Sequence, residues 1–356
     1  MSARKPILII YTGGTIGSVH DPRTGSLVPI DFSQITSHVP ELHRAGITID
    51  AVSFNPPIDS SNVNPSHWRK ISALISTHYK KYDGFVILHG TDTMAFTASA
   101  LSFMIEGLKK PVILTGSQLP IGMPRTDGRE NLLSSVMLAA LRDKNGSPVI
   151  QEISVYFGSK LLRGNRAHKQ SAHSFDAIVS PNYPALVDAG VDFKVNHHAL
   201  YRSSDEQLKL STRFESQVAW LPFFPGMTFE VFEKLLENKN IRGVILSTYG
   251  SGNAPDSEAL KDMLKRAIDR GVTIVNITQC GHGGVKPEMY ATSLMLTECG
   301  VIPGGDMTNE AAITKLMILL GKTDDQEEIK RSLTSDIRGE LTSMSLTSPF
   351  RRTYLV

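Results

Sequence analysis

Short apolar runs that end in glycine and hydroxyl side chains recur along the chain. Residues 86–88, 112–114 and 244–246 each read Val-Ile-Leu, and they precede His-Gly-Thr-Asp, Thr-Gly-Ser and Ser-Thr-Tyr-Gly respectively. Such short and wholly apolar runs are typical of parallel strands that helices cover on both faces. The pattern predicts an α/β fold in which the polar turns gather at the carboxyl ends of the strands.

Alternation and helical spacing of apolar residues predict further elements around these runs. Trp68, Ile71 and Ile75, for example, share one face of an expected helix and are interpreted as core. The expected strands are 7–11, 47–54, 85–88, 111–114, 152–157, 218–221, 244–247 and 273–277, and the expected helices are 64–82, one that follows 91–93 and ends near 107, 127–143, 228–238, 257–270 and 309–320. A polar loop is expected at 55–61.

The chain has 356 residues, more than a typical single domain. From about Val195 to Ser216 the sequence is polar and lacks sustained periodicity, as a linker does. We therefore expect an N-terminal α/β domain at 1–195, a linker at 196–216 and a C-terminal α/β domain at 217–356.

Composition limits the classes of function. The formal net charge is +2 and charged residues make up 20% of the chain, so the charge balance does not favour nucleic-acid binding. No apolar run approaches the ~20 residues that a membrane helix needs. Cys280 and Cys299 are the only cysteines and form no Cys-x-x-Cys pair, which fits a reducing compartment. The expectation is a soluble, cytoplasmic protein.

Two hydroxyl side chains and an acid crowd the turn that follows residues 85–88. Thr91, Asp92 and Thr93 stand at the expected start of a helix, where their oxygens could accept hydrogen bonds from free backbone amides. Helix capping needs only one such residue, however, and here three follow His89 and Gly90. Capping and a catalytic role are both open on this stretch alone.

The first expected strand also ends in a glycine-rich turn, Thr-Gly-Gly-Thr-Ile-Gly at 12–17. The spacing is not Gly-x-Gly-x-x-Gly and a polar loop follows, so a dinucleotide cofactor is not favoured. Thr15 could simply stabilise its own turn. The chain has no Gly-x-Ser-x-Gly elbow, no Gly-x-x-x-x-Gly-Lys-Ser/Thr loop and no His-Glu-x-x-His pair, so we expect no metal and no cofactor.

Threonine, acid and lysine are the reactive groups that stay in consideration. A threonine hydroxyl can act as a covalent nucleophile if a base removes its proton, and a lysine can be that base when its surroundings lower its pKa. The basic stretch at 163–169, Arg-Gly-Asn-Arg-Ala-His-Lys, offers Lys169. A solvated turn is the alternative interpretation of that stretch.

Two stretches together resemble the signatures of bacterial-type L-asparaginases: Tyr-Thr-Gly-Gly-Thr-Ile-Gly at 11–17 and Leu-His-Gly-Thr-Asp-Thr-Met at 88–94. The similarity is closest to the cytoplasmic, type I branch and extends over nearly the whole chain, up to residue 341. It implies a larger N-terminal catalytic domain with a doubly wound, flavodoxin-like parallel sheet and a smaller C-terminal α/β domain. It also implies assembly as a homodimer or homotetramer.

The resemblance implies roles for individual residues. Thr15 would attack the side-chain amide of L-asparagine, which releases ammonia, and water would then free L-aspartate from the ester. Thr91, Asp92 and Lys169 would form a second catalytic group, in which lysine and threonine relay a proton and the acid holds the lysine. The implied substrate-binding residues are Asp59, Ser60, Ser61, Thr91, Asp92, Ser117 and, from a neighbouring subunit, Asn253.

One departure from the family pattern concerns a tyrosine. Many members carry a tyrosine on the loop after the first signature, but this chain has none between Tyr11 and Tyr79. Tyr290 is the candidate substitute, because some type I relatives supply a catalytic tyrosine from this part of the C-terminal domain. An ordinary core or interface aromatic is the alternative.

Other functions also fit these residues. A broader amidohydrolase, such as a glutaminase or a subunit like that of glutamyl-tRNA amidotransferase, would use the same reactive groups. A non-catalytic amino-acid-binding protein would keep the pocket and would show stabilisation by its ligand without turnover.

Overall fold

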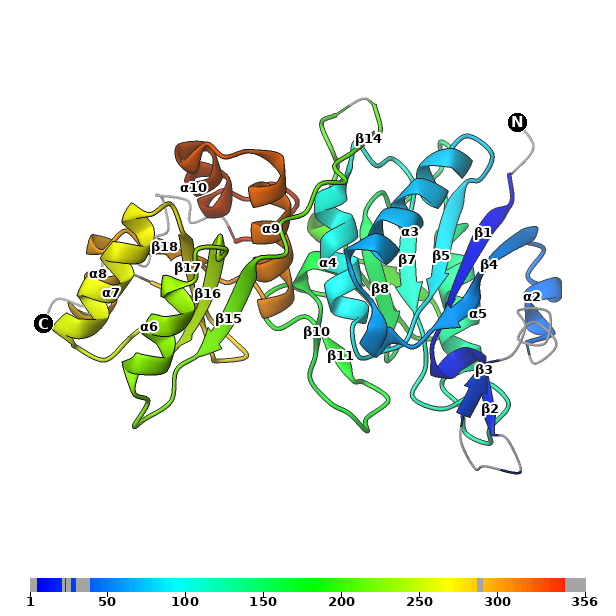
Figure 1. Cartoon of the computed structure of the whole chain (residues 1–356). Coiled ribbons are helices and arrows are strands. Elements are labelled where there is room, and N and C mark those ends of the chain that lie inside the picture. Colours follow the sequence, from blue (N-terminus) through cyan, green and yellow to red (C-terminus); the bar gives the residue numbers. More distant parts are fainter. Residues whose placement is uncertain are drawn as a thin grey trace, which may run out of the picture. The chain divides into compact units, whose positions relative to one another are not determined.

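The computed structural model describes residues 5–20, 23, 27–29, 39–205, 207–286 and 291–342. The chain divides into two compact units, Met1–Ser216 with Thr308–Lys322, and Gln217–Met307 with Thr323–Val356. Residues 196–216, where the sequence predicts a linker, are thus part of the first unit. Each unit has a parallel sheet and helices of its own (Figure 1).

The first unit is built on an eight-stranded sheet. Its five parallel strands lie side by side in the order β4 (Ile49–Ile58), β1 (Ile7–Gly13), β5 (Gly84–Leu88), β7 (Val112–Thr115) and β8 (Ile153–Phe157). The first of these strands in the chain therefore lies between the second and the third, which is the flavodoxin-like order. The order reverses between β1 and β5. The last pair between these two strands joins Tyr11 to Leu88, and β1 continues to Gly13.

Helices cover both faces of this sheet, as the sequence predicts. In Figure 1, α3 (Pro65–His78) and α4 (Met94–Met104) lie in front of the strands. Alternate strand residues such as Ile9 and Val86 belong to one core cluster with Leu132 of α5 (Gly128–Ala139). Ile10, which points to the opposite face, is also fully buried. The doubly wound α/β architecture is confirmed.

Short antiparallel strands extend the sheet beyond β8. They are β9 (Lys160–Arg163), β12 (Val187–Ala189) and β13 (Phe193–Val195). None of them was predicted, because three or four residues are too few to show an alternating pattern.

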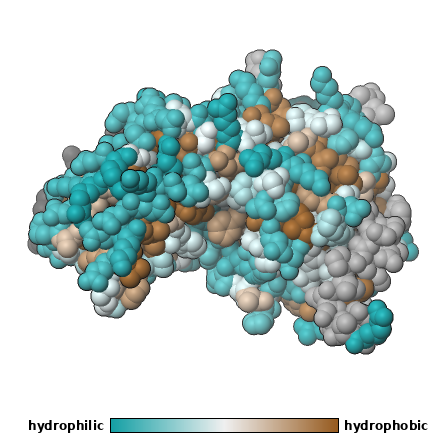
Figure 2. Space-filling model, in the orientation of Figure 1, coloured by the Kyte–Doolittle hydropathy of each residue, from teal (hydrophilic) through white to brown (hydrophobic). Residues whose placement is uncertain are grey.

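The second unit has a four-stranded, wholly parallel sheet. Its strands are β15 (Val218–Pro222), β16 (Gly243–Thr248), β17 (Thr273–Thr278) and β18 (Ile302–Pro303), and its helices are α6 (Phe229–Glu237), α7 (Glu258–Asp269), α8 (Ala291–Glu298) and α10 (Gln326–Thr334). Hydrophilic residues cover the outer side of α6 and α7 in Figure 2, while Leu260 and Leu264 of α7 are fully buried. The smaller C-terminal α/β domain is thereby confirmed, although α8, β18 and α10 were not predicted.

The remaining elements are short pieces and one long helix of the first unit. They are η1 (Thr15–Gly17), β2 (Ser18–His20), β3 (Leu27–Pro29), α2 (Glu41–Arg44), η2 (Ser60–Asn62), β6 (Ile105–Glu106), η3 (Gly164–Arg166), β10 (His168–Lys169), β11 (Ile178–Val179), η4 (His197–Ala199), β14 (Lys209–Leu210) and α9 (Asn309–Lys322).

Several predicted boundaries were wrong, and the helix expected at 64–82 already ends at His78. The loop expected at 55–61 begins later, since β4 continues to Ile58. The helix expected at 127–143 ends at Ala139, where the Arg142 guanidinium turns back and donates hydrogen bonds to the carbonyl oxygens of Ala139 and Leu141, both at 2.9 Å. These bonds satisfy carbonyls that the helix end leaves free.

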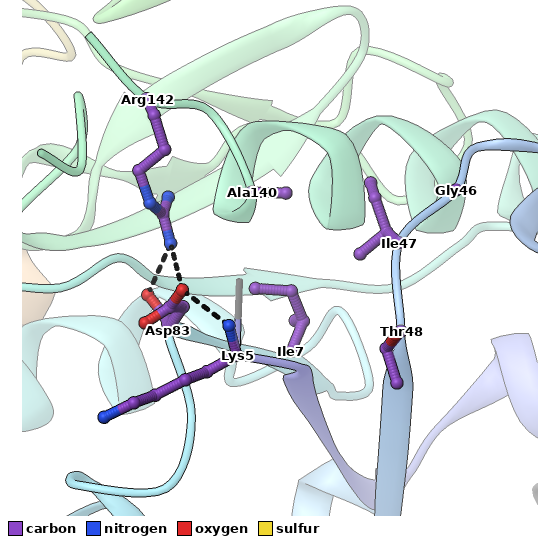
Figure 3. A pocket seen from close by; sticks show the side chains of 8 residues that line it. All are labelled: Lys5, Ile7, Gly46, Ile47, Thr48, Asp83, Ala140 and Arg142. Carbon is purple, nitrogen blue, oxygen red and sulfur yellow. Dashed lines mark hydrogen bonds and ion pairs between the residues drawn. The ribbon is translucent and has the colours of Figure 1, made fainter. Parts of the chain in front are cut away.

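A small cavity of about 50 Å³ lies at the edge of the sheet where the parallel strands begin, among side chains that include Ile7, Thr48 and Arg142 (Figure 3). Asp83 accepts the Lys5 backbone amide at 3.0 Å and lies 3.7 Å from the Arg142 guanidinium. The Asp83 carboxylate thus helps to hold together the segments where the strands begin. Because ligands of open α/β sheets bind at the opposite edge, we assign this cavity a structural role.

Candidate active site

The turns after β1 and β5 and the loop after β4 meet where the strand order reverses. A Cβ atom added to Gly14 would lie 2.5 Å from the Gly90 nitrogen, and one added to Gly90 would lie 2.5 Å from Ser60 Oγ. Contacts this close leave no room for a side chain at either glycine. The two glycines therefore bring the three segments into direct contact at the place where open α/β sheets bind ligands.

Thr15 stands at the start of η1, directly after this contact. Tyr11 holds the turn from inside the core, because its hydroxyl donates a hydrogen bond to the Gly17 carbonyl oxygen at 2.8 Å. The Ser18 hydroxyl donates to the Gly14 carbonyl oxygen at 3.1 Å. Thr15 itself is half-buried, and its hydroxyl has no hydrogen-bond partner in the part of the chain that the structure describes. The backbone of the turn is thus fixed while the hydroxyl is available.

Lys169 reaches the turn after β5 from a distant segment. Its Nζ donates hydrogen bonds to Thr91 Oγ1 at 2.9 Å and to Asp92 Oδ1 at 2.5 Å. Thr91 is 7% exposed, whereas the Asp92 side chain is 63% exposed and the Lys169 side chain 19%. A buried hydroxyl, a lysine and an accessible carboxylate therefore form one connected group.

Thr91 and Asp92 do not cap α4, so the interpretation of this stretch as a helix cap alone is wrong. The N-cap residue of α4 is Thr93, and its side chain makes no capping hydrogen bond. Its hydroxyl donates instead to the Ser60 carbonyl oxygen at 2.7 Å. The three residues thus connect the helix start to Lys169 and to the loop after β4.

The stretch at 163–169 is not a solvated turn. Arg163 is 5% exposed and Arg166 is 1% exposed. Arg163 Nε donates to Glu152 Oε2 at 2.8 Å, and its guanidinium lies 4.3 Å from the centre of the Tyr183 ring. These buried contacts anchor the chain just before β10, which pairs with β11 and presents Lys169. The alternative interpretation of this stretch was therefore wrong.

The loop after β4 begins with a local turn. Asp59 Oδ1 accepts hydrogen bonds from the Ser61 amide and the Ser61 hydroxyl, both at 2.9 Å. Asp59 and Ser61 are exposed, while Ser60 is 4% exposed. The loop thus presents one carboxylate and one hydroxyl outwards and keeps Ser60 against Gly90.

Gln118 is a site residue that the sequence did not single out. Thr91 Oγ1 donates to Gln118 Oε1 at 3.5 Å, and Gln118 Nε2 donates to the Ser174 carbonyl oxygen at 3.0 Å. Asp127 holds the Gln118 backbone amide at 3.0 Å. Gln118 follows the predicted Ser117 in a turn at a strand end, and this position is the signal that could have identified Gln118.

Comparison with known proteins identifies the family of this chain. The family model described as Asparaginase, N-terminal, matches residues 6–201, and the one described as Glutaminase/Asparaginase C-terminal domain matches residues 217–333. This chain belongs to the asparaginase family. It is 40% identical to L-asparaginase 1 of Escherichia coli K12 over 340 residues, which cover 95% of this chain and 98% of that protein.

Two further relatives of this asparaginase-family chain extend the comparison. The crystal structure of L-asparaginase I from Vibrio cholerae superposes with a TM-score of 0.86 at 40% identity and covers 96% of this chain and 100% of that chain. A glutamyl-tRNA(Gln) amidotransferase subunit of Pyrococcus horikoshii is 33% identical over 346 residues, which cover 94% of this chain and 76% of that protein.

Most residues to which the resemblance to asparaginases assigns a role belong to the first unit. Thr91, Asp92 and Lys169 are linked by hydrogen bonds, and the turn that carries Thr15 and the loop 59–61 meet the turn after β5 at Gly14 and Gly90. Ser117 lies in the neighbouring turn but is 1% exposed, and its hydroxyl donates to the Leu119 carbonyl oxygen at 2.5 Å.

The two other assigned residues are Asn253 and Tyr290. Asn253 belongs to the second unit, in the turn that begins at Tyr249. Tyr290 lies outside the described residues, so its assignment stays a sequence prediction.

A buried chain of hydrogen bonds holds the signature stretch at 88–94 on its core side. His89 Nδ1 lies 2.7 Å from the Gly90 carbonyl oxygen and Nε2 lies 2.9 Å from Thr97 Oγ1, which accepts the Trp68 indole N–H at 3.0 Å. A carbonyl only accepts, so Nδ1 carries the proton and Nε2 accepts the Thr97 hydroxyl. Burial lowers the pKa of His89 to about 4, against a smaller opposing effect of the Gly90 carbonyl, so the ring is neutral at neutral pH.

The described part of the chain contains neither a candidate metal cluster nor a candidate membrane-spanning helix. No three His, Cys, Asp or Glu side chains within it are grouped so that they could hold a metal ion. None of the helices in that part of the chain is both long enough and apolar enough to span a bilayer.

We expect Gly14→Ala to destabilise the first unit by about 3 kcal/mol or more, since its φ of 92° and ψ of 172° lie in a region that only glycine adopts easily and the new methyl group would strike Gly90. Gly46→Ala is the matched control. Gly46 has a φ of 65° with nothing within 4 Å of the added Cβ, so we expect a loss of only about 1–2 kcal/mol. Urea unfolding of both variants measures the difference, and equal losses would show that the contact with Gly90 is not tight.

His89 gives a pH dependence of stability with a defined sign. Its folded pKa of about 4 lies below the unfolded value of 6.5, so the unfolded chain binds the extra proton between these values and the free energy of unfolding falls as the pH falls through that window. The expected slope from this residue is about 1.4 kcal/mol per pH unit. His89→Gln lacks this contribution, so the stability gap between the two proteins should narrow from pH 6.5 towards pH 4. A gap that is constant in urea unfolding across this range would contradict the buried, neutral histidine.

Proposed function

We propose that this chain hydrolyses L-asparagine to L-aspartate and ammonia through a covalent intermediate on Thr15. The observation that carries the proposal is the contact of Lys169 with Thr91 and Asp92 beside the Thr15 turn. Membership of the asparaginase family and 40% identity to an L-asparaginase over nearly the whole chain support it.

Thr15 is the proposed nucleophile. Its hydroxyl oxygen attacks the side-chain amide carbon of asparagine and its proton leaves with the amide nitrogen, so ammonia departs and a β-aspartyl ester forms. Water then adds to the ester, and cleavage of the bond to the Thr15 oxygen releases L-aspartate and restores the hydroxyl. A half-buried hydroxyl on a fixed turn suits this role, because nucleophilic catalysis needs a group that is both positioned and accessible.

Lys169 and Thr91 are the proposed proton relay. Lys169 donates to both Thr91 and Asp92 in the structure, and an ammonium nitrogen has no lone pair with which to accept a proton. The relay therefore operates when Lys169 has given up one proton, and the Thr91 hydroxyl can then pass a proton to it. Asp92 fixes the lysine in place throughout.

The substrate's charged groups are proposed to match polar groups around the turn. The carboxylates of Asp59 and Asp92 suit the α-ammonium group, and the hydroxyls of Ser60 and Ser61 suit the α-carboxylate. The amide nitrogen of Thr91 and the Ser117 turn are proposed to lie near the carbonyl oxygen, where developing negative charge needs hydrogen-bond donors.

Several further assignments rest on the resemblance. Asn253 is proposed to reach the site of a neighbouring subunit in a homodimer or homotetramer, and Tyr290 to replace the missing loop tyrosine. The proposed location is the cytoplasm, and the proposed reaction uses no metal and no other cofactor.

The main alternative is an amidotransferase subunit, since the relative from Pyrococcus horikoshii carries that name. Such a subunit would act on a tRNA-bound substrate together with partners, whereas an asparaginase acts alone on free asparagine. A glutaminase would prefer L-glutamine. A non-catalytic binding protein would be stabilised by asparagine and release no ammonia.

We expect the purified chain to release ammonia and aspartate from L-asparagine in equal amounts without added metal, nucleotide or tRNA. A coupled assay for ammonia, run in parallel on L-asparagine and L-glutamine, measures both activities.

Thr15→Ala should lower kcat by about 10³-fold or more while asparagine still raises the melting temperature, because removal of a nucleophile abolishes turnover and not binding. Thr15→Ala with unchanged kcat would reject Thr15 as the nucleophile.

Thr91 can be tested with a pair of variants that differ in the hydroxyl. Thr91→Val has a similar shape without the hydroxyl, and we expect kcat to fall by about 10²–10⁴-fold, the usual contribution of a positioned acid–base group. Thr91→Ser retains the hydroxyl and should keep most of the activity. Equal activity of the two variants in the ammonia assay would show that the Thr91 hydroxyl has no part in the reaction.

A further inference from the structure

His168 and Glu310 form a hydrogen-bonded charge pair directly beside Lys169. His168 Nδ1 lies 2.9 Å from Glu310 Oε1. The His168 side chain is 34% exposed and that of Glu310 is 6% exposed. The second carboxylate oxygen of Glu310, Oε2, is buried and has no hydrogen-bond partner in the described structure. A buried carboxylate is costly unless a positive charge faces it, so His168 is the group that compensates Glu310.

This pair holds the strand that presents Lys169. Successive side chains of a strand point to opposite faces, so His168 is directed to α9 while Lys169 is directed to Thr91 and Asp92. β10 is only two residues long, and its one strand partner among the described residues is the equally short β11. The bond from His168 to Glu310 is therefore a main restraint on β10 from the side of α9.

Glu310, the acceptor of this hydrogen bond, belongs to a helix that is packed against a neighbouring helix. Glu310 lies in the first turn of α9, and α9 packs along α4, the helix that begins just after Thr91 and Asp92. The pair thus links β10 to the packing of α9 against α4. The start of α4 follows just after Thr91 and Asp92, the hydrogen-bond partners of Lys169.

Glu310 and burial define how the pair responds to pH. The hydrogen bond that His168 donates to Glu310 raises the pKa of His168, and burial opposes this effect. α9 also carries Lys315 and Lys322, η3 carries Arg166, and Lys169 follows in β10, whereas α4 and β11 carry no charged side chain. His168 is therefore charged, and the pair fully formed, below the usual histidine pKa. The attraction is lost as the pH rises through the raised pKa of His168.

We propose that His168 and Glu310 are positioning residues for the reaction: their charge pair holds β10 so that Lys169 stays within hydrogen-bond reach of Thr91 and Asp92. Neither residue touches the reacting atoms. The effect on turnover rests on the proposed asparaginase activity, while the effect on the position of Lys169 does not.

The kinetic test uses His168→Gln and Glu310→Gln, which remove one charge each and preserve approximate size. His173→Gln is the matched control, because His173 lies in the same connection, is exposed and faces no carboxylate partner among the described residues. We expect kcat for asparagine to fall about tenfold in both test variants and KM to change by less than about twofold, since only the relay is displaced. The control should match the wild type.

The pH profile separates positioning from a merely structural role. The ratio of the wild-type kcat to that of His168→Gln should be largest below pH 6.5 and decrease as the pH rises through the raised pKa of His168. A ratio that is independent of pH, or test variants that lose melting temperature but keep the wild-type kcat, would overturn the proposal.

A second measurement is independent of asparagine. An amine-acetylating reagent at one fixed pH, followed by mass spectrometry of the peptides, reports how accessible and how strongly held Lys169 is. We expect Lys169 to be acetylated faster in His168→Gln and Glu310→Gln than in His173→Gln and the wild type. Unchanged acetylation would overturn the proposal. Absence of ammonia release by the wild type would instead reject the proposed function, whatever the acetylation shows.

If both test variants fail to fold, titration of His168 by NMR in the wild-type protein decides the matter. A pKa above 6.5 that is accompanied by a shift of the Lys169 side-chain signals supports the coupling. A titration of His168 that leaves the Lys169 signals unchanged overturns it.

Discussion

The backbone contact between Gly14 and Gly90 is the constraint on which the rest of the site depends. The strands that precede these two residues are neighbours at the point where the strand order reverses, so the turns after them must pass one another closely. With no Cβ atom on either residue, the turns approach until Thr15 and Thr91 stand on adjacent segments. The close approach is local, but it decides which side chains can act together.

Buried polar groups fix this arrangement from the core side. His89 links the turn after β5 to Thr97 of α4 and through it to Trp68 of α3, with every polar atom of the ring satisfied. Asp127 plays a comparable part for the turn after β7, where it accepts the amides of Gln118 and Leu119. Networks that are fully satisfied in this way rigidify a site, because any displacement leaves a buried polar group without a partner.

The sequence could predict the fold and part of the site, for identifiable reasons. Strands such as 84–88 are buried on both faces and therefore appear in the sequence as a continuous apolar run. β12 has only three residues, too few to show an alternating pattern. Thr15, Thr91 and Asp92 could be found because they follow strand ends. The contact of Lys169 with Asp92 spans 77 positions and that of His168 with Glu310 spans 142, and no local pattern encodes such separations.

A crystal structure with L-aspartate bound tests most directly whether the turns after β1 and β5 form a single reaction centre. We predict that Thr15 Oγ1 lies about 3–3.5 Å from the side-chain carboxyl carbon of the aspartate, the separation of reacting atoms in a near-attack arrangement. Lys169 should still contact Thr91 and Asp92 in that structure. Aspartate bound away from these turns, or with its side chain directed away from Thr15, would contradict a shared reaction centre.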